Sequence, residues 1–296
     1  MSKILILGGT RFFGKQLVYN LLEHEHEVTV ATRGLTKDPF GKRVNRLIID
    51  RAVKSTLINA FKNKSWDIVY DQTSYSPKEG LYATQALKGK VKRYIFTSSQ
   101  SVYDFGTNRK EEEFNPLTFS FLNKNKQEYL GFKGYQEGKR AVEALLFNDT
   151  AFEVVAARFP IVVGKDDHTK RLAFHVHKVL NNESIGISEK ELRYSFIRSD
   201  EAADFLYDIG QSAFTGAINP GCSNDIALEE LIQKIESRTG EKASITKKVT
   251  NENASPYELE GSCSINTEKA TGLGFTFSNI DNTFDHLIDY YSEKLI

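Results

Sequence analysis

The sequence has few of the residues that mark disulfide-bonded, metal-binding or membrane-spanning proteins. Only two of its 296 residues are cysteines, Cys222 and Cys263, and their spacing matches neither a zinc motif nor a disulfide framework. We therefore expect two reduced thiols. No apolar run approaches the length of a membrane span, and Ser2 and Lys3 lead directly into the first predicted strand, a pattern that is not typical of a signal peptide. We expect a cytoplasmic protein.

The chain also lacks net charge, because 39 basic residues balance 39 acidic ones. No overall electrostatic field would therefore steer it towards nucleic acid or an anionic membrane. The best local basic cluster consists of Lys88, Lys90, Lys92 and Arg93, and no interleaved aromatic residues accompany it. We accordingly predict a small-molecule substrate, and we expect neither a membrane nor a nucleic acid as partner.

A glycine-rich turn follows four aliphatic residues at the start of the chain, where residues 4–14 read Ile-Leu-Ile-Leu-Gly-Gly-Thr-Arg-Phe-Phe-Gly. Residues 12–22 then repeat apolar side chains at helical spacing. A strand that enters a helix through glycines lets the backbone approach a phosphate, and the positive end of the helix dipole points at the anion. This pattern predicts a site for the pyrophosphate of a dinucleotide. The predicted contacts are Gly8, Thr10, Arg11, Phe12, Phe13 and Gly14.

The turn departs from the usual dinucleotide fingerprint at one position. Arg11 stands where a middle glycine is common, while Gly8 and Gly14 keep the outer positions. A tight turn without any ligand is the alternative interpretation. Arg11 is then either a solvated loop cation or a phosphate contact.

Strands and helices alternate through the first half of the chain. Buried strands are predicted at residues 28–32, 46–50, 67–71 and 93–98, with helices at 53–61 and 81–87. This order predicts an α/β fold with a Rossmann-type, doubly wound parallel sheet. Because parallel strands end at one edge of their sheet, ligands are expected at that edge.

The second half of the chain is less regular. Residues 104–134 form a long polar excursion, which predicts either a functional lid or a disordered segment. A helix at 135–147 and a strand at 153–158 follow. Further helices are predicted at residues 171–180, 200–209, 228–238 and 280–291, with short strands between them. These later elements predict a smaller C-terminal lobe.

A tyrosine and a lysine stand four residues apart in the predicted helix, as Tyr135 and Lys139, and hence on one helical face. A free tyrosine has a pKa of about 10, and a neighbouring cation would stabilise the phenolate and lower it. The preceding strand ends in the hydroxyl residues Ser98 and Ser99, at the same edge of the sheet. An amphipathic helix with two exposed polar residues is the alternative interpretation.

With these motifs, the chain resembles the extended short-chain dehydrogenase/reductase superfamily, in the branch of NAD-dependent epimerases and dehydratases. The resemblance rests on residues 8–14, 98–103, 135–139, 158–164 and 195–200. The Gly-Gly-x-x-x-x-Gly loop is similar to that of an atypical subgroup. Some members of that subgroup are described as chloroplast RNA-binding proteins, and others as reductases or dehydratases.

The resemblance implies a catalytic set of Ser99, Tyr135 and Lys139. Tyr135 would be the general acid and base, while Lys139 would bind the nicotinamide ribose and lower the pKa of the phenol. Ser99 would bond the same substrate oxygen, although Ser98 is close enough to be confused with it. Dehydratases carry an Asp-Glu pair after the hydroxyl residue, where this chain has Gln100 and Ser101. The resemblance therefore leaves epimerisation or carbonyl reduction as the expected reaction.

The predicted cofactor is NADP, with NAD as the alternative. Enzymes of this fold that use NAD place an acid at the end of the second strand, where this chain has Thr32 and Arg33, and a guanidinium can hold a 2′-phosphate. An apolar alanine is common among relatives where Asp71 and Gln72 stand. Further predicted cofactor contacts are Asp50, Gln72, Thr73, Ser98, Tyr135, Lys139, Phe159 and Pro160. The predicted substrate contacts are Ser99, Gln100, Tyr135 and Arg198.

The resemblance also implies that different parts of the chain bind the cofactor and the substrate. Residues 1–163 would form the NAD(P)-binding domain and residues 164–296 mainly the substrate-binding lobe, with part of 195–222 returning to the first domain. No metal site is predicted, because His175 and His177 face different ways on their helix. Relatives commonly form homodimers, and we expect the same here.

We thus predict an NAD(P)-dependent oxidoreductase or epimerase that acts on a nucleotide sugar or a related hydroxyl or carbonyl compound. The alternatives are an RNA-binding protein that retains the fold and a dinucleotide sensor without turnover.

Overall fold

The structure is a computed structural model that describes residues 1–149 and 151–295. The chain divides into two compact units. Unit 1 contains Met1–Tyr103, Glu111–Phe159 and Ala202–Asn219, and unit 2 contains Asp104–Lys110, Pro160–Glu201 and the chain from Pro220 onward. The assignment of cofactor binding to one part of the chain and substrate binding to the other stays a prediction.

Unit 1 is built on a seven-stranded sheet in the order β11-β7-β5-β4-β1-β2-β3. Every neighbouring pair is parallel, which confirms the predicted doubly wound fold. The strands are β1 (Lys3–Leu7), β2 (Glu27–Thr32), β3 (Asn45–Ile48), β4 (Ile68–Asp71), β5 (Arg93–Ser99), β7 (Glu153–Phe159) and β11 (Gly216–Ile218). The order reverses between β1 and β4, and a crevice for ligands forms at such a reversal.

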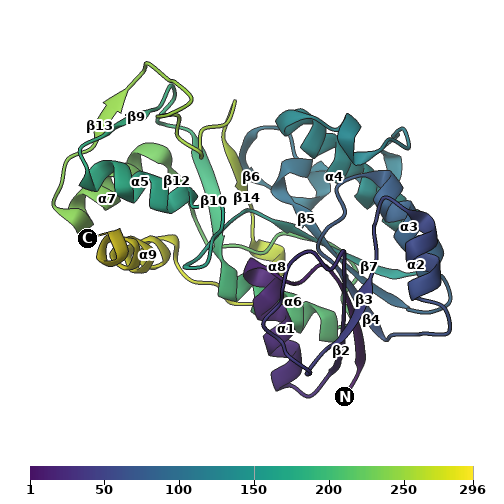
Figure 1. The fold of residues 1–296 in the computed structure, drawn as a ribbon. Coiled ribbons are helices and arrows are strands. Elements are labelled where there is room, and N and C mark those ends of the chain that lie inside the picture. The colour runs from purple at the N-terminus through teal and green to yellow at the C-terminus, as the bar shows by residue number, and fades with distance from the viewer. Residues whose placement is uncertain (150, 296) are drawn as a thin grey trace. The chain divides into compact units, whose positions relative to one another are not determined.

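Helices cover both faces of this sheet, as Figure 1 shows. One face carries α2 (Lys54–Ala60), α3 (Pro77–Leu87) and α4 (Gly131–Phe147), which pack apolar side chains against the strands. The other face carries α1 (Phe12–Glu23) and α6 (Ser199–Gln211). These two helices are joined by a 2.6 Å hydrogen bond from Asn20 Nδ2 to Asp204 Oδ1.

The polar excursion at residues 104–134 contains short elements of its own. These are β6 (Gly106–Arg109), η2 (Glu111–Glu113), η3 (Pro116–Thr118) and η4 (Lys126–Glu128), the last three being 3₁₀ helices. Within unit 1, the buried Arg158 guanidinium anchors the segment by donating to the carbonyls of Glu111 (2.8 Å) and Phe114 (3.1 Å). The role of a lid stays a prediction.

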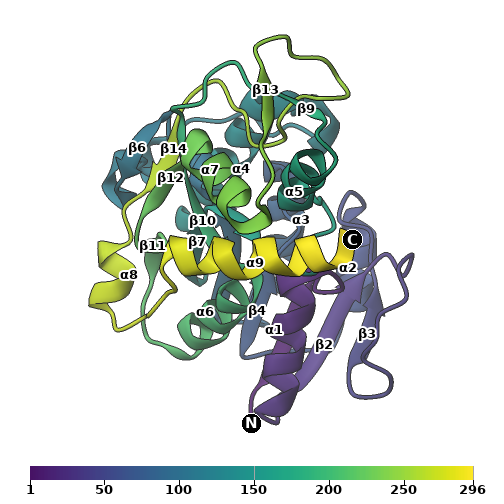
Figure 2. The ribbon, with the colours of Figure 1, turned by 90° about the vertical axis from the view of Figure 1, so that its left-hand side faces the viewer.

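Unit 2 combines small sheets with a helical layer. Its strands are β8 (Ile161–Val163), β9 (Ser184–Gly186), β10 (Arg193–Arg198), β12 (Asp225–Ala227), β13 (Ser244–Thr246) and β14 (Cys263–Ile265), together with β6. Its helices are α5 (Arg171–Leu180), α7 (Leu228–Thr239), α8 (Glu268–Gly272) and α9 (Ile280–Leu295). Figure 2 shows α5, α7 and α9 lying together. Their buried apolar side chains belong to one hydrophobic core. Both cysteines are buried as free thiols. None of the helices described is both long enough and apolar enough to cross a bilayer.

Candidate functional site

The glycine turn after β1 needs the backbone freedom that only glycine supplies. Gly8 and Gly9 have φ values of 109° and 80°, in a region that side chains with a Cβ rarely adopt. A Cβ on Gly8 would also lie 2.7 Å from Thr73 Cγ2, at the end of the neighbouring strand β4. At Gly14, in the first turn of α1, a Cβ would collide with the Gln72 side chain. The turn, the helix N-terminus and the end of β4 therefore meet closely.

A cavity of about 900 Å³ opens beside this turn, within unit 1. It is large enough for a cofactor. The predicted residues that line it are Gly8, Thr10, Arg11, Arg33, Asp50 and Thr73. Residues not predicted from the sequence complete its wall, among them Arg51, Tyr75, Lys78, Glu79, Asn125 and Lys126.

Two exposed arginines carry positive charge at this cavity. Arg11 donates to Thr36 Oγ1 at 3.3 Å, and Arg33 makes no ion pair with any residue that the structure describes. A guanidinium without an acidic partner is suited to an anionic ligand.

Other predicted cofactor residues lie outside the cavity wall. Phe13 and Phe159 pack on each other with ring centroids 5.6 Å apart, and Phe159 also contacts the ring of Phe205. Phe12 and Gly14 are buried in the first turn of α1, and Pro160 belongs to unit 2. Their contacts with a cofactor stay predictions.

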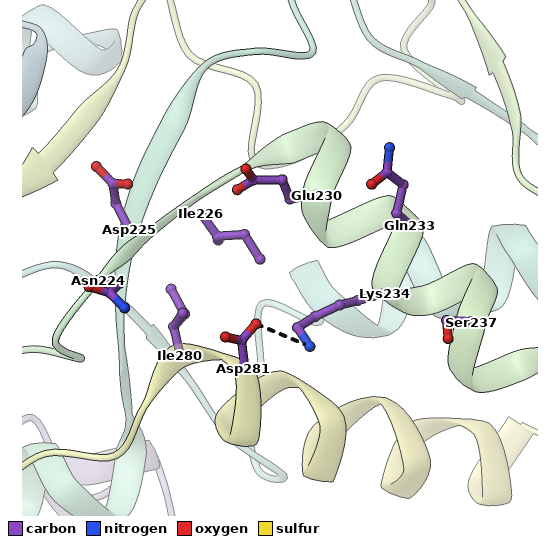
Figure 3. Close-up of a pocket in the computed structure, with 9 residues that line it drawn as sticks. All are labelled: Asn224, Asp225, Ile226, Glu230, Gln233, Lys234, Ser237, Ile280 and Asp281. Atoms are coloured by element: carbon purple, nitrogen blue, oxygen red, sulfur yellow. Dashed lines mark ion pairs between the residues drawn. The ribbon is translucent and has the colours of Figure 1, made fainter.

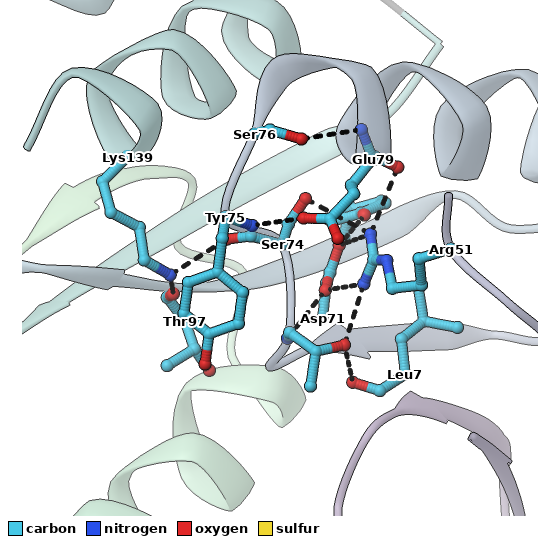
Figure 4. Close-up of polar contacts among 11 residues, drawn as sticks. Leu7, Arg51, Asp71, Ser74, Tyr75, Ser76, Glu79, Thr97 and Lys139 are labelled. Atoms are coloured by element: carbon cyan, nitrogen blue, oxygen red, sulfur yellow. Dashed lines mark hydrogen bonds and ion pairs between the residues drawn. The ribbon is translucent and has the colours of Figure 1, made fainter. Parts of the chain in front are cut away.

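A buried ion pair between Arg51 and Asp71 occupies the ends of β3 and β4, and the sequence analysis missed it (Figure 4). Arg51, 9% exposed, donates to both carboxylate oxygens of Asp71, with the Nη2–Oδ2 distance 2.7 Å, and to the hydroxyls of Thr73 and Ser74. Tyr94 donates its hydroxyl to the same carboxylate. Burial opposes ionisation of Asp71, but the Arg51 charge outweighs it and lowers the pKa of Asp71.

The only sequence signal for this pair was the acid at position 71. The family resemblance implied an apolar residue there, so the acid indicated a local difference but not its partner. Arg51 supplies the partner from 20 residues away in sequence.

Helix α4 brings Tyr135 and Lys139 together, as their spacing predicts. Lys139 Nζ lies 5.8 Å from the centre of the Tyr135 ring and donates to the carbonyls of Ser74 (3.1 Å) and Thr97 (2.9 Å). Lys139 is only 2% exposed, whereas Tyr135 is 36% exposed. Burial lowers the pKa of Lys139 to about 8, partly countered by the charge of Asp71. Both catalytic roles stay predictions.

The serines at the end of β5 have different surroundings. Ser98 donates its hydroxyl to the buried Glu143 carboxylate, which also pairs with Arg158. Ser99 Oγ accepts a 3.2 Å hydrogen bond from the backbone N–H of Ser101, which leaves its own proton available to another acceptor. The next residue, Gln100, is buried, and its Oε1 has no partner among the described residues. This geometry favours Ser99 over Ser98 as the predicted substrate contact.

The predicted substrate residue Arg198 lies in unit 2 and pairs with Asp200, whose hydrogen bonds raise the pKa of the arginine. Unit 2 also holds a cavity of about 450 Å³ between β12, α7 and α9 (Figure 3). Lys234 lies in its wall and pairs with Asp281 at 3.1 Å. No residue predicted from the sequence lines this cavity. The described residues contain no group of three or more metal-binding side chains.

The parallel sheet, the glycine turn and the Tyr-Lys helix define an α/β protein of the Rossmann type. Residues 4–217 match the NAD dependent epimerase/dehydratase family, and the chain belongs to this family, as predicted.

Solved structures share the fold over the whole chain. UDP-glucose 4-epimerase from Thermus thermophilus, in complex with NAD, is 18% identical and has a TM-score of 0.75, with 98% of each chain covered. The Thermotoga maritima UDP-glucose 4-epimerase, with UDP-glucose, is 14% identical with a TM-score of 0.77, covering 99% of this chain and 100% of that one. Pal from Bacillus thuringiensis is 22% identical with a TM-score of 0.74, again covering 99% and 100%.

A curated relative is similar over a shorter stretch. It is the chloroplast stem-loop binding protein of 41 kDa b from Arabidopsis thaliana, 33% identical over 117 residues. The match spans 34% of this chain and 30% of that protein. The likeness therefore concerns less than a third of the relative's length.

Proposed function

We propose that the protein is an NAD(P)-dependent epimerase or reductase that acts on a nucleotide sugar or a related hydroxyl or carbonyl compound. Ser99, Tyr135 and Lys139 are its proposed catalytic set. The observation that carries the proposal is the buried Lys139 ammonium, 5.8 Å from the Tyr135 ring, in the unit that also holds the cavity at the glycine turn.

The proposed acid and base is the Tyr135 hydroxyl. An unperturbed phenol holds its proton up to a pH of about 10, so it needs a nearby positive charge to exchange protons near neutrality. Lys139 provides that charge from a site with little water, where the electrostatic interaction is strong. Ser99 would donate to the same substrate oxygen, since its Oγ already accepts from a backbone N–H.

The residues at the cavity suit a pyridine dinucleotide. The glycine turn offers backbone N–H groups to a pyrophosphate, and Arg33 and Arg11 offer guanidinium groups where a 2′-phosphate would lie, which favours NADP over NAD. A bound nicotinamide ring would take up and return a hydride. Asp50 would face the adenosine, as the family resemblance implies.

The proposed reaction is epimerisation or carbonyl reduction. Dehydration needs a carboxylate pair after the hydroxyl residue, and this chain carries Gln100 and Ser101 there. The Thermotoga maritima enzyme, solved with UDP-glucose, supports a nucleotide sugar as the substrate class to test first.

Tyr135→Phe tests the proposal, because it removes one hydroxyl and leaves the ring in place. We expect the variant to bind NADP or NAD like the wild type and to lose turnover of UDP-sugars by about 10²- to 10⁴-fold. Tyr82→Phe is the matched control: Tyr82 lies on the neighbouring helix α3, and its hydroxyl makes no hydrogen bond with a described residue. Equal activity of Tyr135→Phe and wild type would exclude the assignment. Binding without turnover in the wild type would favour the sensor.

RNA binding is the second candidate, favoured by the match to the stem-loop binding protein. The local basic cluster gives RNA binding little support, because three of its four basic side chains already bind other groups of the protein. Lys90 donates to the carbonyl of Phe61, Lys92 pairs with Glu153, and Arg93 donates to the carbonyls of Ile209 and Gly210. RNA affinity that falls steeply with added salt would support this candidate, and an absence of binding to stem-loop RNA would exclude it.

A further inference from the structure

The cavity at the glycine turn ends before it reaches the proposed catalytic residues. Its wall includes Tyr75 and Lys126, whereas Ser99, Tyr135 and Lys139 are not among the described residues that line it. A dinucleotide that filled only this cavity would therefore not touch Lys139. The side chains between the cavity and Lys139 therefore determine whether the nicotinamide ribose can reach the Lys139 ammonium.

Tyr75 belongs to the cavity wall, and its ring lies beside the Lys139 ammonium (Figure 4). Its centre is 4.8 Å from Lys139 Nζ and 4.2 Å from Lys126 Nζ, so two ammonium groups share one aromatic ring. The Tyr135 ring is also near, with the two ring centroids 6.3 Å apart. Tyr75 thus contacts both members of the Tyr-Lys pair and a residue of the cavity wall.

Tyr75 also helps to enclose the Lys139 ammonium. Two of the three N–H donors of an ammonium group are used here by the carbonyls of Ser74 and Thr97. The third has no oxygen acceptor among the described residues, and the rings of Tyr75 and Phe96 both lie 4.8 Å from the nitrogen. The donor that a ribose hydroxyl would need is therefore covered by aromatic carbon.

The backbone of Tyr75 is fixed although its side chain is not hydrogen-bonded. Its N–H donates to Glu79 Oε2 at 2.9 Å, and the following Ser76 caps helix α3. Its hydroxyl makes no hydrogen bond with a described residue. Burial raises the pKa of Tyr75, so the phenol stays protonated and is not a second base. No side-chain hydrogen bond therefore has to break when the Tyr75 ring rotates.

We propose that Tyr75 is an aromatic gate and a positioning residue for Lys139: its ring closes the inner end of the dinucleotide cavity, and the nicotinamide ribose displaces it to reach the ammonium. The inference rests on the proposed function, since it assigns the ribose of a pyridine dinucleotide to Lys139. It predicts that the adenosine half of the cofactor binds without moving the Tyr75 ring. The nicotinamide half has to displace the ring, and this displacement reduces the net binding free energy of that half.

Amine labelling tests the enclosure without any cofactor. A lysine with a lowered pKa reacts fast with an acylating reagent at pH 8 when it is accessible, so an enclosed Lys139 should instead label slowly. Peptide mapping should find slow labelling in the wild type and in Tyr75→Phe, which keeps the ring, and fast labelling in Tyr75→Ala. Equal labelling rates in wild type and Tyr75→Ala would overturn the gate. Thermal unfolding shows whether each variant is folded. If Tyr75→Ala does not fold, Tyr75→Val is used in its place.

Ligand titration tests the displacement and separates it from the proposed function. If the open gate is a minor state of at most about 10%, Tyr75→Ala should bind NADP or NAD at least about tenfold more tightly than the wild type. ADP, which lacks the nicotinamide ribose, should bind both proteins equally. Equal dinucleotide affinities with normal ADP binding would overturn the gate alone. A lack of binding of ADP and both dinucleotides to the wild type would overturn the proposed function as well.

Discussion

The two units of the chain differ in how they bury charge. Among the described residues of unit 1, Arg51, Asp71, Lys139, Glu143 and Arg158 are all buried, and four of them form two ion pairs. Unit 2 packs a core of aliphatic and aromatic side chains, in which the buried titratable groups described are the carboxylate Asp167, the histidine His175, two thiols and three tyrosines.

This difference indicates where the chain concentrates its polar chemistry. Buried ions are costly unless they are paired, and a hydrophobic core of equal volume is often as stable. In unit 1 the Arg51–Asp71 pair and Lys139 stand at the carboxyl ends of β3, β4 and β5, where the fold binds ligands. Arg51 also lines the cavity at the glycine turn, whereas the described residues of unit 2 contain no comparable cluster of buried charges.

The largest effect is expected when one of the two buried ion pairs of unit 1, Arg158–Glu143, is broken. Arg158→Met leaves Glu143 buried without its partner, which should lower the free energy of unfolding by about 3–5 kcal/mol. Urea unfolding measures this loss. In unit 2, Arg198→Met removes a half-exposed pair with Asp200 and should cost less than about 1 kcal/mol. If Arg158→Met lowers the free energy of unfolding by less than about 1 kcal/mol, the proposed difference between the buried pair of unit 1 and the half-exposed pair of unit 2 is wrong.

The second prediction concerns His175, a buried histidine of unit 2. Burial lowers the pKa of His175 to about 4, from 6.5. As pH falls from about 6.5 to 4, the unfolded chain binds the proton and the folded one does not, so about 3 kcal/mol of stability should be lost over this range. Unfolding measured against pH should show a weaker dependence in His175→Gln. The exposed His177→Gln is the control, and an identical slope in both variants would refute the prediction.

The third prediction concerns cofactor choice at the cavity of unit 1. Arg33→Ala removes a guanidinium that would hold the 2′-phosphate, so the affinity for NADP should fall by about tenfold or more while NAD binds as before. Calorimetric titration measures both. An equal loss of affinity for NADP and NAD would show that Arg33 does not bind the 2′-phosphate.

The last prediction concerns the pH profile of the proposed enzyme. If Tyr135 needs the charged form of Lys139, whose pKa burial lowers to about 8, kcat/KM should fall above that pH, by about tenfold for each further unit. The profile of the free enzyme measures this directly. A kcat/KM that stays constant up to a pH of about 10 would argue against a role for the ammonium.

The sequence predicted the features that depend on local pattern. Aliphatic runs and the glycine turn gave the strands and the start of α1, and the spacing of Tyr135 and Lys139 placed both on one face of α4. It did not predict the Arg51–Asp71 pair, because that contact depends on the order of the strands in the sheet. Tyr75 was missed for the same reason: its neighbours Lys139 and Lys126 come from distant segments. Strand β11, only three residues long, leaves no periodic pattern to read.

The central claim is that unit 1 binds a pyridine dinucleotide, and calorimetric titration of the wild-type protein with NADP and NAD tests it most directly. We expect saturable binding at one site per chain, with a Kd between about 1 μM and 1 mM, competition by ADP, and the lower Kd for NADP. A protein that takes up neither dinucleotide at millimolar concentration would contradict the account.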